Sequence, residues 1–357
     1  MAAPRFHRLK IAAVRPETSD AVAIRFEVPA ALADDYAFTP GQYLTLRAEI
    51  DGEDVRRSYS ICSPLGDEAL EVGVKRIEGG AFSSHAMTLK AGDELDVMTP
   101  QGRFLAPIGG AHDYLLLAAG SGVTPMVSIA RSVLEGEPES RVTLLYANRT
   151  TDSVMFREAF DDLKDRFMTR FRLTHVMDEE TQDLELFNGR LDAEKLATMA
   201  TRGLIEPKEA DAVYVCGPQP MIEAASKALG ELGVDEARIK HELFTPAGGM
   251  PTASAASKPK PVEGGARVEV VLDGARRSFS VDPAAETVLE AASRAGLELP
   301  YSCAGGMCCT CRCKVAEGEA SMDLNYSLEP WELEAGYTLA CQTRPTTPRL
   351  VLDFDAA

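Results

Sequence analysis

The feature that most constrains this chain is a group of closely spaced cysteines near its C-terminal end. Four of them have the spacing C-x4-C-x2-C followed by one distant cysteine, and they are Cys303, Cys308, Cys311 and Cys341. This is the plant-type spacing of thiolates that hold a [2Fe–2S] cluster. Gly305 and Gly306 would let the loop turn tightly and point backbone N–H groups at the sulfurs. The spacing therefore predicts a [2Fe–2S] cluster site.

Three other uses of these cysteines are a zinc site, a set of disulfides or buried free thiols. Zinc sites usually contain C-x2-C pairs, and only one pair here fits that spacing. Disulfides need an oxidising compartment, and nothing in the sequence indicates one. Cys309 and Cys313 lie inside the motif but off its spacing, so we expect them to be small packing residues.

Composition limits the class of protein. A chain of 357 residues is long enough for roughly two to three domains. Its net charge of −18 argues against nucleic acid or an anionic membrane as a partner, although such a charge also simply favours solubility. Eight cysteines without a secretory signal predict a reducing, cytoplasmic setting. No apolar run reaches the ~18 residues of a membrane span.

The first part of the chain has the pattern of an antiparallel β-barrel. Segments rich in β-branched and aromatic residues alternate with Pro, Gly and Asp at 6–14, 21–28, 43–48 and 70–75. The motif Arg57-Ser58-Tyr59-Ser60 follows an acidic loop. Arg can pair with a pyrophosphate, Tyr can stack on a planar ring, and Ser can hydrogen-bond the edge of that ring. The alternative is an exposed strand with a cross-strand arginine.

A second candidate anion site lies just after the fourth of these segments. Gly79 and Gly80 precede a helix-like run that ends near Leu89. Glycines before a helix start expose backbone N–H groups to an anion, and Ser83 and Ser84 add hydroxyls.

Beyond residue 105 the pattern changes to that of a parallel α/β domain. The continuous apolar run 114–119 is typical of a buried parallel strand, and the turn GSGVTP and a helical stretch at 126–134 follow it. Thr124 can cap the helix and Pro125 suits its first position. A strand, a glycine turn (Gly120 and Gly122) and a helix start form a phosphate site, the alternative being an ordinary βα turn.

The next strands end at the same predicted sheet edge. The strand 142–146 leads to Asn148 and Arg149, where the adenosine ribose of a dinucleotide should lie. Arg149 can accept a 2′-phosphate, which favours NADPH over NADH, unless this arginine simply faces solvent. A third buried strand, 212–215, leads into Cys216, Gly217 and Pro218. The domain ends in His-Glu-Leu-Phe, residues 241–244.

The region 246–265 is dominated by Pro, Gly, Ala, Ser and Lys, which predicts a linker, although an ordered loop between domains is the alternative. After it, 268–272 and 278–281 flank the hairpin signal Asp273-Gly274, and 287–295 is helical. This order before a cysteine loop fits a β-grasp ferredoxin. Acidic residues before Cys341 form either a solvated face or a docking patch for an electropositive acceptor; they are Asp323, Glu329, Glu332 and Glu334.

These segments resemble a known family. PYSCAGGMCCTCRCKV and GYTLACQTRP look like the C-terminal ferredoxin domain of oxygenase reductases, and RSYS, GGAFSS, GSGVTP and CGP resemble motifs of the ferredoxin–NADP reductase family. The resemblance covers essentially the whole chain. It implies a multi-domain fold: an FAD-binding β-barrel (1–105), a Rossmann-like α/β NAD(P)-binding domain (106–245), the linker (246–265) and an α+β β-grasp [2Fe–2S] domain (266–357).

The resemblance also assigns roles to residues. Arg57, Ser58, Tyr59 and Ser60 would contact the flavin. The segment around the FAD phosphates would consist of Gly80, Phe82, Ser83 and Ser84. Cys216 would lie near the nicotinamide, and Phe244 would cover the flavin face unless it packs in the core. Ser60, Cys216 and Glu242 would line the hydride-transfer site.

The implied function is an NADPH-dependent oxidoreductase. NADPH delivers two electrons as hydride, a [2Fe–2S] cluster carries one at a time, and FAD joins the two. Within the family, the segment 317–326 looks most like the subgroup whose acceptor is the di-iron oxygenase acting on phenylacetyl-CoA. One alternative is the reductase of a different, ring-hydroxylating oxygenase. Another is a non-catalytic redox sensor, against which the intact GSGVTP and CGP turns argue.

Overall fold

The structure is a computed structural model that describes residues 4–67, 69–244 and 265–356. In these residues the chain forms two compact units. The larger unit covers 6–55 and 59–244, and the smaller covers 265–356 with the short segments 4–5 and 56–58. The predicted linker, except for Gly265, lies outside the described residues.

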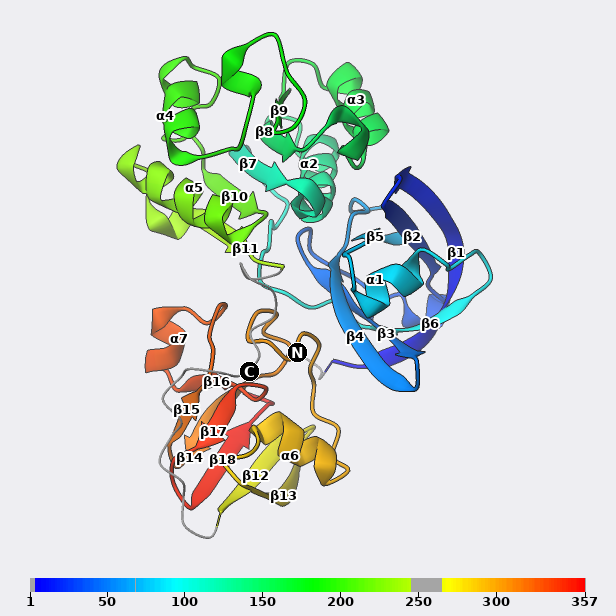
Figure 1. Ribbon diagram of the computed structural model, residues 1–357, viewed down its shortest axis with the longest axis vertical. Helices are drawn as coiled ribbons and strands as arrows, with labels where there is room; N and C mark the ends of the chain where they lie inside the picture. The colour runs from blue at the N-terminus through cyan, green and yellow to red at the C-terminus, as the bar shows by residue number, and fades with distance from the viewer. Residues whose placement is uncertain (1–3, 68, 245–264, 357) are drawn as a thin grey trace. The chain divides into compact units, whose positions relative to one another are not determined.

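The larger unit begins with a curled six-stranded antiparallel sheet in the order β4-β3-β6-β1-β2-β5 (Figure 1). Its strands are β1 (Phe6–Thr18), β2 (Ala21–Glu27), β3 (Tyr43–Ile50), β4 (Glu53–Ser60), β5 (Leu70–Lys75) and β6 (Glu94–Met98). The helix α1 (Ala81–Ala86) follows β5. Side chains along β2 alternate between the two faces of this sheet. Val22 and Ile24 pack in the interior of the curled, barrel-like sheet, while Ala21 and Ala23 face outward.

The second half of this unit is a five-stranded parallel sheet in the order β11-β10-β7-β8-β9. Its strands are β7 (Asp113–Ala119), β8 (Arg141–Asn148), β9 (Phe171–Met177), β10 (Ala212–Cys216) and β11 (Ile239–Glu242). The helices are α2 (Val123–Gly136), α3 (Arg157–Arg166), α4 (Ala193–Thr201) and α5 (Gln219–Glu231). In Figure 1, α2 and α3 cover one face of the sheet and α4 and α5 the other.

The smaller unit has a five-stranded sheet in the order β13-β12-β18-β14-β16 and a two-stranded sheet, β15-β17. Its elements are β12 (Ala266–Leu272), β13 (Ala275–Val281), α6 (Val288–Arg294), β14 (Arg312–Glu317), β15 (Ala320–Met322), α7 (Pro330–Glu334), β16 (Tyr337–Leu339), β17 (Thr343–Pro345) and β18 (Arg349–Asp353). Asp273 and Gly274 both have positive φ, as the hairpin signal predicts. Thr287 and Glu290 form a capping box at α6.

Two local expectations were incomplete. The helix after the glycine turn begins at Val123, so Thr124 is its second residue; its hydroxyl donates to Ser121 O (3.0 Å) and does not cap the helix. The segment 151–211, where the sequence pattern predicted no elements, contains α3, β9 and α4. In α3 only Phe160 and Leu163 are buried among charged residues, so its apolar periodicity is weak. No helix in the described residues is long and apolar enough to cross a membrane.

Candidate functional site

The four cysteines of the predicted cluster site come together as two pairs. The Cys303 N–H points at Cys308 Sγ (3.5 Å), and the thiols of these two residues interact directly. Cys311 interacts in the same way with Cys341, which lies after β16, and it also lies near Cys308. No group of three or more His, Cys, Asp or Glu side chains within 4–67, 69–244 and 265–356 is arranged around a single metal ion. Two pairs fit a cluster of two irons better than a mononuclear zinc site, because each iron can take two thiolates.

The backbone of this loop favours thiolates. The Gly305 N–H donates to Cys303 Sγ (3.3 Å), and Gly306 has φ of +76°, where an added Cβ would lie 3.0 Å from Leu324 O. The neighbouring Cys308 thiol and backbone N–H groups lower the pKa of Cys303 to about 6. Donors of this kind around sulfur also stabilise a negatively charged cluster.

Two residues that make polar contacts at this site were missed by sequence reasoning. Thr310 Oγ1 lies 3.2 Å from Cys308 Sγ, and Gln342 Nε2 donates to Ala304 O (2.9 Å) and approaches Cys341 Sγ (3.6 Å). Their only signal in the sequence is that each lies close to a predicted ligand. Gln342 ties the distant fourth cysteine to the loop that holds the other three.

Cys309 and Cys313 occupy different surroundings. Cys313 is fully buried in the core of the smaller unit, and burial raises the pKa of its thiol. Cys309 has φ of +57° and donates to Ser327 Oγ (3.0 Å), which in turn donates to Gly306 O (3.1 Å).

In the larger unit, Ser60, Cys216 and Glu242 meet although they are far apart in the sequence. Ser60 ends β4, and its hydroxyl donates to Glu242 Oε2 (3.3 Å). Cys216 and Glu242 are paired residues at the ends of the parallel strands β10 and β11. Burial raises the pKa of Glu242 to about 8, against a smaller lowering by Ser60. Burial, and then Glu242, raises the pKa of Cys216, so this thiol is held neutral.

The aromatic residues beside Ser60 lie next to each other. The Tyr59 ring is 5.7 Å from the Phe82 ring, and Phe82 is buried in the barrel core. Arg57 is exposed and donates to Arg56 O (2.7 Å), and Ser58 is half-buried. Tyr59 is half-buried and directly precedes Ser60 in the chain, which fits a planar flavin ring at this strand end.

The segment predicted to hold phosphates divides into two kinds of residue. Ser83 is buried and accepts from the Ile77 N–H (3.0 Å) while donating to Gly80 O (3.2 Å), so its hydroxyl stabilises the local turn. Ser84 lies within α1 and is exposed. Space around Gly79 is open, and its φ is +72°. The exposed part of the segment therefore fits an anion, and the buried part shapes it.

The turn between β7 and α2 comes very close to the end of β10. A Cβ at Gly122 would lie 2.2 Å from Cys216 O, so only glycine fits there. Gly120 has φ of +53° with open space around it, and both Thr124 and Pro125 are buried in the first turn of α2. Gly217 and Pro218 form the matching turn before α5. Both turns lie at the carboxyl edge of the sheet, where α/β folds bind nucleotides.

The end of β8 offers a buried amide and an exposed guanidinium. Asn148 is only 7% exposed, and its side-chain amide, beside the Tyr146 hydroxyl, has no hydrogen bond of acceptable geometry among the described residues. Arg149 is exposed and pairs weakly with Asp20 (3.7 Å), a partner that the sequence did not indicate. A buried amide at this strand end fits a polar ligand such as a ribose.

Phe244 is 38% exposed, which rules out the core-packing alternative.

The predicted acidic docking patch is wrong in its composition. Glu332 is fully buried and pairs with Arg312 (2.8 Å), and Asp323 pairs with Arg344 (2.7 Å). Two of the four predicted carboxylates are therefore held in internal ion pairs. Of the four, only Glu329 and Glu334 are exposed.

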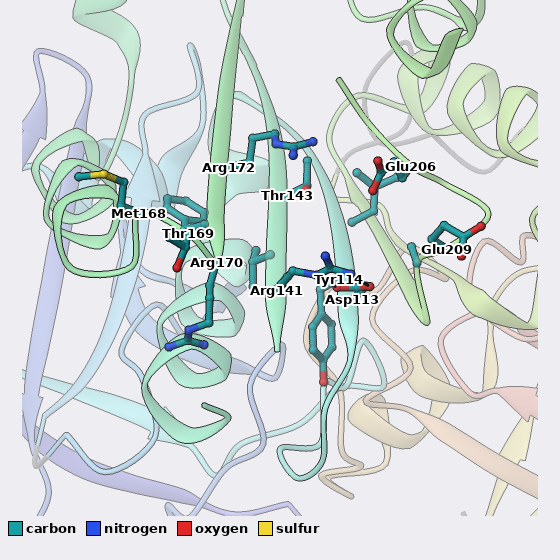
Figure 2. A pocket seen from close by; sticks show the side chains of 14 residues that line it. Asp113, Tyr114, Arg141, Thr143, Met168, Thr169, Arg170, Arg172, Glu206 and Glu209 are labelled. Carbon is teal, nitrogen blue, oxygen red and sulfur yellow. Dashed lines mark hydrogen bonds and ion pairs between the residues drawn. The ribbon is translucent and has the colours of Figure 1, made fainter. Parts of the chain in front are cut away.

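A surface hollow of about 180 Å³ lies at the opposite, amino-terminal edge of the parallel sheet (Figure 2). Arg141 there is bound to Asp113 by two hydrogen bonds (2.6 Å each), and Arg170 donates to three carbonyls around the C-terminal end of α2. Its arginines are already engaged and it is remote from the strand ends described above, so we do not assign it to the nucleotide.

The fold and these sites define a modular electron-transfer oxidoreductase, and comparison with known proteins identifies its family. Family models match an oxidoreductase FAD-binding domain at 9–105, an oxidoreductase NAD-binding domain at 116–227 and a 2Fe-2S iron-sulfur cluster binding domain at 270–346. One subunit of the 1,2-phenylacetyl-CoA epoxidase from Escherichia coli (strain K12) is 45% identical over 98% of both chains. The ferredoxin reductase component of 3-ketosteroid-9-alpha-monooxygenase from Rhodococcus rhodochrous is 38% identical over 97% of this chain and 96% of that one.

Among solved structures, phthalate dioxygenase reductase matches with a TM-score of 0.58 and 25% identity over 98% of both chains. That protein is described as a modular structure for electron transfer from pyridine nucleotides to [2Fe-2S]. The present chain belongs to the family of oxygenase reductases that combine FAD-binding, NAD-binding and 2Fe-2S domains.

Proposed function

We propose that this protein is the NADPH-dependent reductase component of a di-iron oxygenase, the phenylacetyl-CoA epoxidase. The observation that carries the proposal is the meeting of Ser60, Cys216 and Glu242 at one strand edge of a chain that also holds two cysteine pairs. The 45% identity to a phenylacetyl-CoA epoxidase component supports this acceptor over the ring-hydroxylating alternative. We place the reaction in the cytoplasm, where thiols stay reduced.

FAD would be held by Arg57, Ser58, Tyr59 and Ser60 at its ring and by the exposed part of the 79–84 segment at its phosphates. NADPH would bind at the Gly120 and Gly217 turns, with its ribose at Asn148 and Arg149. When bound, FAD would supply the conversion between the two-electron chemistry of the nucleotide and the one-electron chemistry of the cluster. The protein's own residues would bind and orient the two cofactors and exclude water from the space between them. The Ser60 hydroxyl donates to the Glu242 carboxyl group. The Cys216 thiol is neutral, so it adds no charge at the edge of the sheet where the nucleotide would bind.

The acceptor is tested by reconstitution. Purified protein, NADPH and the oxygenase subunits of phenylacetyl-CoA epoxidase should turn over phenylacetyl-CoA, whereas oxygenase subunits of a 3-ketosteroid monooxygenase should not turn over their own substrate. Turnover with the 3-ketosteroid monooxygenase subunits alone would overturn the assignment of the acceptor.

The flavin is tested by denaturing the purified protein, which should release FAD. Release of FMN alone would contradict the proposed site for the FAD phosphates.

A redox sensor would show no sustained ferricyanide or cytochrome c reduction with NADPH. That outcome would overturn the catalytic proposal as a whole. A different pattern, rapid dye reduction with no oxygenase turnover, would leave the reductase intact and reject only the acceptor.

A further inference from the structure

The helix α2, whose first turn carries the predicted nucleotide-phosphate site, is hydrogen-bonded along its side to the loop that joins β4 to β5 of the barrel-like sheet. The Ser128 hydroxyl donates to Ser63 O (2.7 Å) in a buried contact, and the Leu65 N–H donates to Ser132 Oγ (2.9 Å). Ser128 and Ser132 are four residues apart and therefore lie on the same side of the helix. We call the whole contact surface between α2 and the barrel-like sheet the α2 seam. It consists of Ser128 and Ser132 with Ser63 and Leu65, Thr124 with Gly73, and Phe156 with Gly73 and Glu17.

At the start of α2, the residue of the barrel-like sheet that faces the helix is a glycine, Gly73 of β5. Along β5, Val72 and Val74 point into the barrel core, so Gly73 points outward. A Cβ at Gly73 would lie 2.7 Å from Thr124 Cγ2 and 3.0 Å from Phe156 Cζ. The φ of Gly73 is not in the left-handed region, so the glycine is required by space and not by backbone conformation.

A third contact closes the seam on the side of α3. The Phe156 N–H donates to Glu17 Oε2 (2.7 Å), and Arg15 pairs with Glu17 from the same strand. Phe156 has φ of +58°, an unfavourable conformation for a bulky residue, which its buried ring and this hydrogen bond stabilise.

We propose that Gly73 is a positioning residue, which lets α2 pack closely enough on the barrel for the nicotinamide to reach the flavin. The inference rests on the proposed function. The groups proposed to bind NADPH lie in the parallel-sheet half of the unit, and the motif proposed to hold the flavin ring, Arg57 to Ser60, lies on the barrel strand β4. The seam therefore sets the separation of the two ligands and not the affinity for either. Hydride transfer moves two electrons and one proton from the dihydronicotinamide to the flavin, and its rate falls steeply with separation.

The test is Gly73→Ala in the full-length protein loaded with FAD and cluster. We expect the limiting rate of flavin reduction at saturating NADPH to fall roughly ten- to a hundredfold, since a displacement near ~1 Å can cost that much. FAD content should stay within about twofold of wild type, and the dissociation constant for NADP⁺ should rise by a much smaller factor than the rate falls, because the new methyl group meets the Thr124 side chain and not the Gly120 turn. Gly230→Ala, at an exposed glycine with open space around it, is the matched control and should change none of these values.

A double-mutant cycle separates positioning from general damage. Thr124→Ser removes the methyl group nearest the new Cβ while keeping a hydroxyl for Ser121 O. The rate loss caused by Gly73→Ala should therefore be smaller in the Thr124→Ser background. An unchanged limiting rate in Gly73→Ala overturns the inference, as does weaker NADP⁺ binding with the rate preserved. If wild type itself fails to reduce its flavin with NADPH or NADH, the proposed function fails instead.

Discussion

The cluster loop and the Ser60–Cys216–Glu242 site are the two places for which we propose electron transfer, and they are constructed in opposite ways. Three of the four cysteines lie within nine residues, and their arrangement follows from the local spacing and the φ of Gly306. Ser60, Cys216 and Glu242 come from a barrel strand and two parallel strands. A local motif fixes the first site, whereas only the packing of two sheets creates the second. Substitutions should therefore act locally in one and through packing in the other.

The largest effect should come from the ligand cysteines. Replacing Cys303, Cys308, Cys311 or Cys341 by Ser should remove the cluster completely, because one of the two irons would lose one of its two thiolates. Iron content and visible absorbance would measure the loss, and FAD should remain bound. Cys309→Ser and Cys313→Ser are matched controls and should keep the cluster. If Cys309→Ser lost iron as completely as Cys308→Ser, the two-pair assignment would be wrong.

A smaller effect is expected at Glu242, through pH. Its raised pKa, about 8, means that the folded state retains a proton that the unfolded state releases above about pH 4.5. This carboxyl should therefore lower stability progressively from pH 4.5 to pH 8. Between pH 6 and pH 9 the contribution is roughly 2–3 kcal/mol, at about 1.4 kcal/mol per pKa unit.

Denaturant unfolding of wild type and Glu242→Gln at both pH values would measure this contribution. Wild type should lose more stability than the variant on going to pH 9. Equal losses would mean that the carboxylate is already well solvated at the strand edge.

Arg149→Ala should weaken the use of NADPH by roughly tenfold in kcat/KM, since one charge-assisted contact is worth ~1.5–3 kcal/mol and this side chain is well exposed. NADH kinetics and the flavin and cluster spectra should not change. Steady-state assays with both nucleotides decide the matter. A wild-type preference for NADH, or equal weakening of both nucleotides, would show that Arg149 does not contact the 2′-phosphate.

The smallest expected effect concerns Asp20, whose carboxylate would compete with the 2′-phosphate of NADPH for the Arg149 guanidinium. Asp20→Asn keeps a side chain that can bond Thr18 Oγ1 but removes the charge that pairs with the guanidinium. We expect kcat/KM for NADPH to rise about two- to threefold, the scale of an exposed ion pair, with no change for NADH. The gain should disappear in the Arg149→Ala background. A gain that persists there would have to come from another cation, such as Lys75.

The features that could be predicted from the sequence are local ones: the cysteine spacing, the Asp273-Gly274 hairpin, the helix at 287–295, and the buried strands β7, β8 and β10. Each depends on residues close together in the chain, because backbone conformation and alternation are local properties. Three contacts became visible only in the folded chain: the burial of Glu332 against Arg312, the pairing of Asp20 with Arg149, and the approach of Gly73 to Thr124. Those contacts join residues on different elements, and a linear pattern of charge or size does not indicate which surface will face which.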